Sequence, residues 1–167
     1  MKKKLILTFI IILNFVLVSG QSKTNDLIDT ETIVDIEVAT FKFLFENNAS
    51  SLKKKANVYF IGINDTTNKT LNNVILKLRK VNSKVKDVKE FEILNLEEKT
   101  KIKFLLFNID KITFENGKAY VSCGYYEGSL SSSGNVITLV KKRKKWKVIM
   151  NEMLWISAIP KSNELLS

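Results

Sequence analysis

Residues whose types could do chemistry gather at the end of one predicted strand. There Tyr125, Tyr126 and Glu127 precede a serine-rich stretch that leads to Asn135. A carboxylate beside two phenols is a pattern in which Glu127 acts as a general base or as a hydrogen-bond acceptor. The same pattern also suits a strand end that is capped by the polar residues of its own turn. We take Tyr125, Tyr126, Glu127 and Asn135 as a candidate binding patch, with Glu127 as the weak candidate for a catalytic residue.

The composition excludes the common catalytic sites that depend on His or on paired Cys residues. The 167 residues include no His and a single Cys. Without His there is no Ser-His-Asp triad, no Cys-His dyad and no His-ligated zinc site. None of Ser131, Ser132 and Ser133 has a Lys three residues later, so a Ser–Lys arrangement is not indicated either. The sequence therefore favours a non-catalytic role and leaves an enzyme as the alternative.

Two aromatic residues and one thiol have both a structural and a functional interpretation. Trp146 alternates with Val148 and Met150, which is typical of core packing, whereas Trp155 remains a candidate platform for stacking against a carbohydrate. Cys123 lies on a strand face with apolar neighbours, which predicts a buried, inert thiol. Pairing with the thiol of a partner chain is the alternative for an odd Cys in an exported protein.

Acidic residues are dense at the start of the first predicted helix, but their spacing does not match a calcium loop. An EF-hand needs a Gly at its sixth position and a Glu at its twelfth, and neither is in place. We predict no metal and no cofactor. The acidic residues are Asp26, Asp29, Glu31, Asp35 and Glu37.

The basic charge does not predict a nucleic-acid partner. The chain has 27 basic and 17 acidic residues, but only two of the basic ones are Arg, the residue that suits phosphate and base recognition. Residues 21–50 are acidic and residues 51–150 basic, so we expect the acidic first helix to dock against or lie beside the basic half. The basic run 141–145 lies at a predicted turn, so we interpret it as a solvated surface. Binding to a membrane surface is the alternative.

The N-terminus has the pattern of a signal peptide. Residues 1–20 contain three Lys, an apolar run of 14 residues and a small-residue cleavage site, which predicts a periplasmic or secreted protein. An uncleaved anchor is disfavoured, because 14 helical residues rise only about 21 Å. Removing residues 1–20 takes away three Lys and no acid, which leaves a net charge of +7. We predict a single domain over residues 21–157 and a tail over 158–167.

The periodicity along the chain predicts an α+β fold. Helices are expected over 27–48, capped by Asp26 or Thr30, and over 68–80. Residues 81–100 read as irregular, with a possible strand at 91–94. We therefore predict two helices packed on an antiparallel, meander-type sheet of four to six strands. The strands are expected at 57–63, 101–115, 118–127 (after an Asn-Gly turn), 136–140 and 146–150, with 155–156 extending the last one.

Several of these segments together resemble a family of small exported bacterial proteins without assigned function. The resemblance covers most of residues 33–157, and its most specific part is the stretch from Tyr-Tyr-Glu to Ser-Gly-Asn. A looser resemblance, to the cone-shaped NTF2-like fold, implies a pocket between sheet and helix. The segments that carry the family resemblance are 41–48, 59–61, 124–128, 130–135, 145–148 and 154–157.

These observations lead to one expected function and one alternative. We expect an exported, non-catalytic binding or accessory module that holds a protein, a glycan or a small-molecule ligand through Tyr125, Tyr126, Glu127, Asn135 and Trp155. We expect it to be a monomer or a weak dimer. The alternative is an NTF2-like pocket protein, or an enzyme that uses Glu127 with Tyr125 or Tyr126.

Overall fold

The chain folds as an α+β protein, which confirms the predicted class. The computed structural model describes residues 28–64, 66–127 and 131–158, so the predicted signal peptide lies outside it. Of the predicted tail 158–167 only Ala158 is described, and it belongs to the last strand. The described residues form four helices and one six-stranded sheet. The elements are α2 (Thr30–Asn47), β1 (Val58–Ile63), α3 (Asn68–Arg79), β2 (Val85–Asp87), α4 (Val88–Glu92), α5 (Leu96–Lys101), β3 (Phe104–Glu115), β4 (Lys118–Glu127), β5 (Ser131–Lys142) and β6 (Lys145–Ala158).

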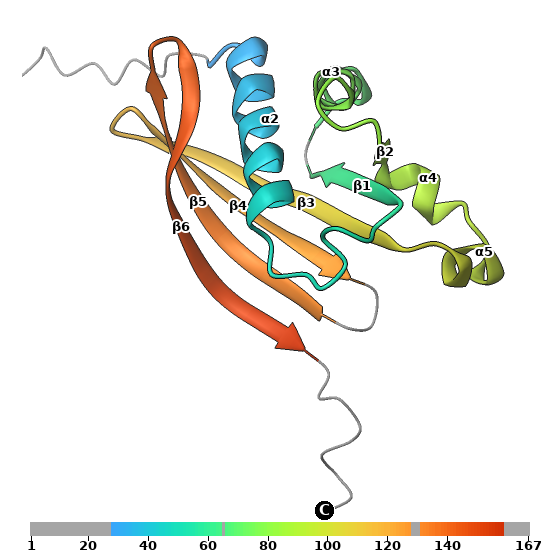
Figure 1. Ribbon diagram of the computed structural model, residues 1–167. Coiled ribbons are helices and arrows are strands. Elements are labelled where there is room, and N and C mark those ends of the chain that lie inside the picture. The colour runs from blue at the N-terminus through green and yellow to red at the C-terminus, as the bar shows by residue number, and fades with distance from the viewer. Residues whose placement is uncertain (1–27, 65, 128–130, 159–167) are drawn as a thin grey trace, which may run out of the picture.

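The sheet combines a parallel end with an antiparallel meander. Its strand order is β2-β1-β3-β4-β5-β6, and the four strands β3 to β6 are antiparallel neighbours. By contrast, β1 pairs in parallel with both β2 and β3, so the sheet is mixed. A parallel pair needs a crossover, and α3 to α5 supply it here. Figure 1 shows α2 lying across the sheet while α3, α4 and α5 gather at the β1–β2 end.

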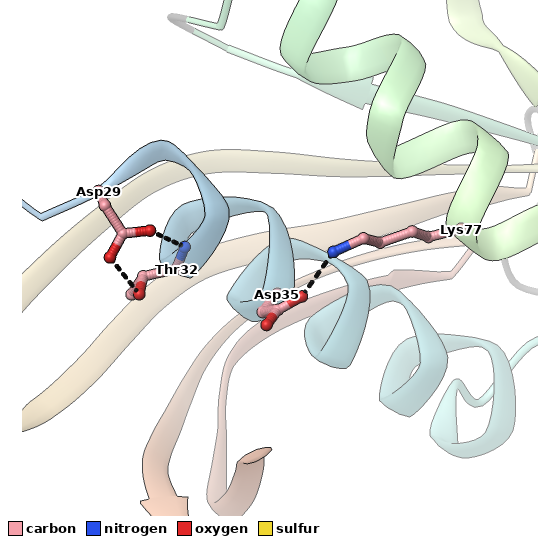
Figure 2. A network of polar contacts seen from close by, with 4 residues as sticks. All are labelled: Asp29, Thr32, Asp35 and Lys77. Carbon is pink, nitrogen blue, oxygen red and sulfur yellow. Dashed lines mark hydrogen bonds and ion pairs between the residues drawn. The ribbon is translucent and has the colours of Figure 1, made fainter. Parts of the chain in front are cut away.

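The N-cap of α2 is Asp29, so the predicted cap, Asp26 or Thr30, is wrong. The Asp29 side chain accepts hydrogen bonds from the Thr32 backbone N–H and from the Thr32 hydroxyl, both at 2.8 Å (Figure 2). Both hydrogen bonds lower the pKa of Asp29 below its ordinary value, and the bond from the Thr32 backbone N–H has the larger effect. This side chain satisfies one of the backbone donors that every helix start leaves without an intrahelical partner.

An ion pair joins α2 to α3. Asp35 of α2 and the Lys77 ammonium of α3 are 2.7 Å apart (Figure 2). The acidic helix therefore forms this contact with the neighbouring helix. Both side chains are about half exposed, so the pair adds little to stability.

The segment 81–100 is more regular than the sequence indicates. It contains the short strand β2 and the helices α4 and α5, so the predicted strand at 91–94 is wrong. Local capping explains the two helices. The Asp87 side chain accepts from the Lys89 backbone N–H, and Asn95 and Glu98 form a reciprocal capping box.

Two tight hairpins set the registers of the meander. Asn116 and Gly117 have φ of 50° and 72°, as the predicted Asn-Gly turn requires. Arg143 and Lys144 also have positive φ, of 48° and 66°. The second turn therefore contains only these two residues, and the rest of the basic run 141–145 belongs to β5 and β6.

The two faces of the sheet are covered differently. On one face, which we call the covered face, Phe41 and Leu44 of α2 join a core that includes Phe107, Val121 and Leu139. The opposite, outer face is covered at the β1–β3 end, where Phe91 of α4 packs on Phe60 and Phe104 with ring centroids 5.2 and 4.5 Å apart. Over β4 to β6 the outer face carries exposed side chains, and the candidate site lies there.

Candidate functional site

Strand alternation separates the predicted patch into two groups. Along β4, Tyr125 is 4% exposed and belongs to the core, whereas its neighbour Tyr126 is 43% exposed. Successive side chains of a strand point to opposite faces, so Glu127 shares the side of Tyr125. The structure therefore does not bring Tyr125, Tyr126 and Glu127 together at one surface.

Tyr125 and Asn135 are buried and line a small cavity between the sheet and the end of α2. The Asn135 side chain accepts a hydrogen bond from the Ser133 hydroxyl at 3.0 Å and donates one to Asn151 at 2.9 Å. The Tyr125 hydroxyl has no partner among the described residues, and it lines a cavity of about 20 Å³. That volume has room for one water molecule. This arrangement suits a structural role for both residues.

Glu127 is held inside the molecule. Its side chain is 2% exposed, and Oε1 accepts a hydrogen bond from the Ser51 hydroxyl at 2.8 Å. Ser51 belongs to the segment that follows α2, so this bond ties the end of β4 to that segment. A carboxylate engaged in this way serves as an anchor, and its role as a catalytic base stays a prediction.

The outer face contains a groove of about 320 Å³ built around two glycines. Gly124 of β4 and Gly134 of β5 are directly paired across the strands, and neither carries a side chain to fill the face. Gly in the interior of a strand often marks a place where a ligand or another backbone comes close. Four of the five predicted binding residues line the groove: Tyr125, Tyr126, Asn135 and Trp155. Of these four, only Tyr126 and Trp155 are exposed.

Trp155 packs directly on Gly134. A Cβ atom built on Gly134 would lie 2.3 Å from Nε1 and 2.7 Å from Cε2 of the indole, far inside van der Waals contact. The indole is nevertheless 53% exposed. Its register explains this position, because β6 continues past an irregularity at Leu154 and pairs Trp155 with Gly134 on the outer face. The Trp155 ring therefore packs against the backbone at Gly134 while about half of the residue stays exposed to solvent.

Polar groups complete the groove. Its lining includes Asn108, Asp110, Ser122 and Ser132. The Asp110 side chain is positioned by hydrogen bonds from Asn108, at 2.6 Å, and from Asn64, at 3.2 Å, and both end on Oδ1. Asp110 is the additional residue of an irregularity in β3, between Ile109 and Lys111. An aromatic surface with a few oriented polar groups is a common composition for a ligand site.

Apolar side chains extend along β6 beyond the groove. This strand forms one edge of the sheet, and its residues 149–156 include six of the eleven large apolar residues that are exposed in the described part of the chain. Irregularities at Ile149 and Leu154 interrupt its pairing with β5, and such bulges also blunt an edge against further strand pairing. The exposed side chains are Ile149, Met150, Met153, Leu154, Trp155 and Ile156.

Cys123 is a buried free thiol. The pKa of this thiol is raised to about 12. Burial is the larger cause of the rise, and the Asp110 carboxylate is the smaller cause. Because the thiolate is the reactive form, this environment makes the sulfur inert.

The described part of the chain shows neither a membrane span nor a metal centre. Within residues 28–158, apart from the undescribed positions, no helix has both the length and the apolarity to cross a bilayer. The same residues contain no group of three or more Cys, Asp or Glu side chains arranged to hold a metal ion.

A buried acid that the sequence analysis did not single out is Glu37. Its side chain is 2% exposed on the covered face of the sheet, and burial raises its pKa from 4.5 to about 7. The helical period was the available signal, because Val34 and Phe41 are core residues at positions that share a helix face with residue 37. Grouping Glu37 with the other early acids concealed its inward position.

Comparisons of the chain with protein-family models, with curated proteins and with solved structures gave no match.

Proposed function

We propose that this chain is an exported, non-catalytic binding module that holds a neutral glycan in the outer-face groove. The observation that carries the proposal is the half-exposed indole of Trp155 seated on Gly134. Aromatic side chains with an apolar face and a polar tip suit ligands that are apolar on one face and polar at the rim. Sugar rings have this chemistry, since their C–H faces stack on aromatic rings while their hydroxyls form hydrogen bonds.

The rest of the groove supports a neutral sugar over an acidic one. Asp110 is ready to accept hydrogen bonds from hydroxyl groups, whereas its carboxylate repels uronic acids and sulfated sugars. Ser122, Ser132 and the Asn108 side chain add further polar partners. The volume of about 320 Å³ suits one or two sugar rings lying over Gly124 and Gly134.

The test is a glycan array probed with the mature chain, followed by calorimetry on the neutral oligosaccharide that binds best. Trp155→Ala should weaken binding at least thirtyfold, about 2 kcal/mol, because Trp side chains at the centre of a contact dominate its energy. Tyr126→Phe should change affinity less than Tyr126→Ala, because it keeps the ring.

Met150→Ala is the matched control, since Met150 is as exposed as Trp155 on the same strand but does not line the groove. It should leave affinity within twofold of the original protein. Equal losses in Trp155→Ala and Met150→Ala would instead indicate a protein partner along β6. Binding confined to acidic glycans would contradict the proposal.

A further inference from the structure

A second cavity lies on the covered face, at the point where β1 ends and β3 continues. Its volume is about 330 Å³, and it opens between α2 and the irregularity of β3. Four isoleucines, Ile33, Ile63, Ile109 and Ile112, give it apolar walls. This volume lies at the lower end of the range for small-molecule sites, so the cavity has room for a small organic ligand.

One charged group in this cavity lacks a partner. Glu37 lines it, and its Oε2 atom is fully buried without a hydrogen bond from any described residue. Among the other polar residues that line the cavity, Asn64 donates to Asp110 at 3.2 Å, and Asp110 and Lys111 are exposed. Leaving a carboxyl group unpaired in an apolar site costs free energy, so such a group is a strong attachment point for a complementary ligand.

We propose that this cavity binds a small organic ammonium ion, with its hydrocarbon part against the isoleucines and its N–H groups donating to Glu37. The charges around the cavity favour a cation. Two carboxylates, Glu37 and Asp110, line it together with one ammonium, that of Lys111, so a bound cation balances the set. An anionic ligand would instead add a third negative charge beside a buried one.

The protonation behaviour of Glu37 is consistent with this ligand. Burial raises its pKa to about 7, so at neutral pH the carboxyl is divided between its two forms. A cation held against Oε2 favours the ionised form and thereby gains a charge-assisted hydrogen bond. The site is separate from the glycan groove, because the two cavities lie on opposite faces of the sheet and share only Asp110.

The test compares three probes of one shape: cyclohexylammonium, cyclohexanol and cyclohexanecarboxylate. Each is titrated into the mature chain at pH 7.5 and followed by the NMR signals of the isoleucine methyl groups. We expect saturable binding of cyclohexylammonium at least tenfold tighter than that of cyclohexanol, and no binding of the carboxylate. The shifts should include Ile63 and Ile109, which line the cavity.

Glu37→Gln keeps the shape of the side chain and removes its charge. It should abolish the tenfold preference for the ammonium while leaving the affinity for cyclohexanol unchanged. Glu46→Gln, an exposed position on the same helix, is the control and should behave like the original protein. Equal affinities for cyclohexylammonium and cyclohexanol, no saturable binding of any probe, or a preference that survives Glu37→Gln would each overturn the proposal.

Discussion

The two cavities lie on opposite faces of one sheet and are built in opposite ways. The outer-face groove exists because Gly124 and Gly134 lack side chains, so an exposed indole can sit on the backbone. The cavity on the covered face exists where β1 stops short, and it places a carboxyl group among isoleucines. The outer-face groove is open because two positions lack side chains, whereas the cavity contains a carboxyl oxygen, Glu37 Oε2, without a hydrogen-bond partner among the described residues. This contrast is the reason why we propose a stacked neutral ligand on the outer face and a cation on the covered face.

The largest expected effect concerns Glu37 and the pH dependence of stability. Its folded-state pKa of about 7 lies above its ordinary value of 4.5, so the folded protein binds more protons than the unfolded chain between these values. The free energy of unfolding should therefore fall as pH rises through this window and stay level above it. Asp110 and Lys111 of β3 are the charged groups that line the cavity with Glu37.

Glu37→Gln should remove this fall and stabilise the protein at pH 8 by about 3 kcal/mol. Urea unfolding of both proteins at pH 5, 6, 7 and 8 measures the difference. A pH-independent gap between the two proteins would show that Glu37 is not desolvated as described. The cavity on the covered face would then not differ from the outer-face groove by holding a desolvated carboxyl group.

The next effect concerns the seat of Trp155. Gly134→Ala places a methyl group where the indole now lies, so the ring must move and the groove must change shape. We expect a loss of about 2 kcal/mol in stability, in the range of overpacked sites, together with a more mobile indole. Thermal unfolding and the fluorescence anisotropy of Trp155, measured in a Trp146→Phe background, report both.

Gly62→Ala provides the control, because its added methyl would meet only a Val88 side chain at 3.2 Å. It should cost less than Gly134→Ala and leave the Trp155 signal unchanged. A Gly134→Ala protein with the original stability and an unchanged indole would refute the close packing.

The smallest effect compares the two buried glutamates. Glu127, unlike Glu37, receives a hydrogen bond from Ser51. Ser51→Ala removes that donor and should cost about 1 kcal/mol, because a buried carboxylate then loses a partner. Ser50 is the neighbouring control, and since it bonds the Leu52 backbone N–H, Ser50→Ala should weaken only the local turn. A Ser51→Ala protein as stable as the original would mean that Glu127 is held by other contacts.

The parts of the fold that follow local rules were accessible from the sequence. The period of two separates Tyr125 from Tyr126, and the Asn116-Gly117 pair marks its hairpin, because both depend only on neighbouring residues. The parallel pairing of β1 was not accessible, because a strand of six residues does not specify a partner that lies 46 residues away, as Phe104 does from Val58.

The candidate site was accessible only in part. Tyr126 and Trp155 could be named from their types, but their meeting depends on the pairing of Gly124 with Gly134 and on the irregularity at Leu154. Registers of this kind are set by bulges and turn lengths that the sequence pattern does not display. Glu37 could have been placed inside from the helical period alone.

The most direct test of the glycan groove uses the two tryptophans of the chain. Trp155 lines the groove, whereas Trp146 packs against Phe114 on the covered face, with ring centroids 6.4 Å apart. An NMR titration with a neutral oligosaccharide, with the indole N–H signals assigned through Trp155→Phe, follows both rings at once. We expect the Trp155 signal to shift in a saturable manner and the Trp146 signal to stay in place. Glycan binding that leaves the Trp155 signal in place, or no shift with any neutral oligosaccharide, would contradict this expectation.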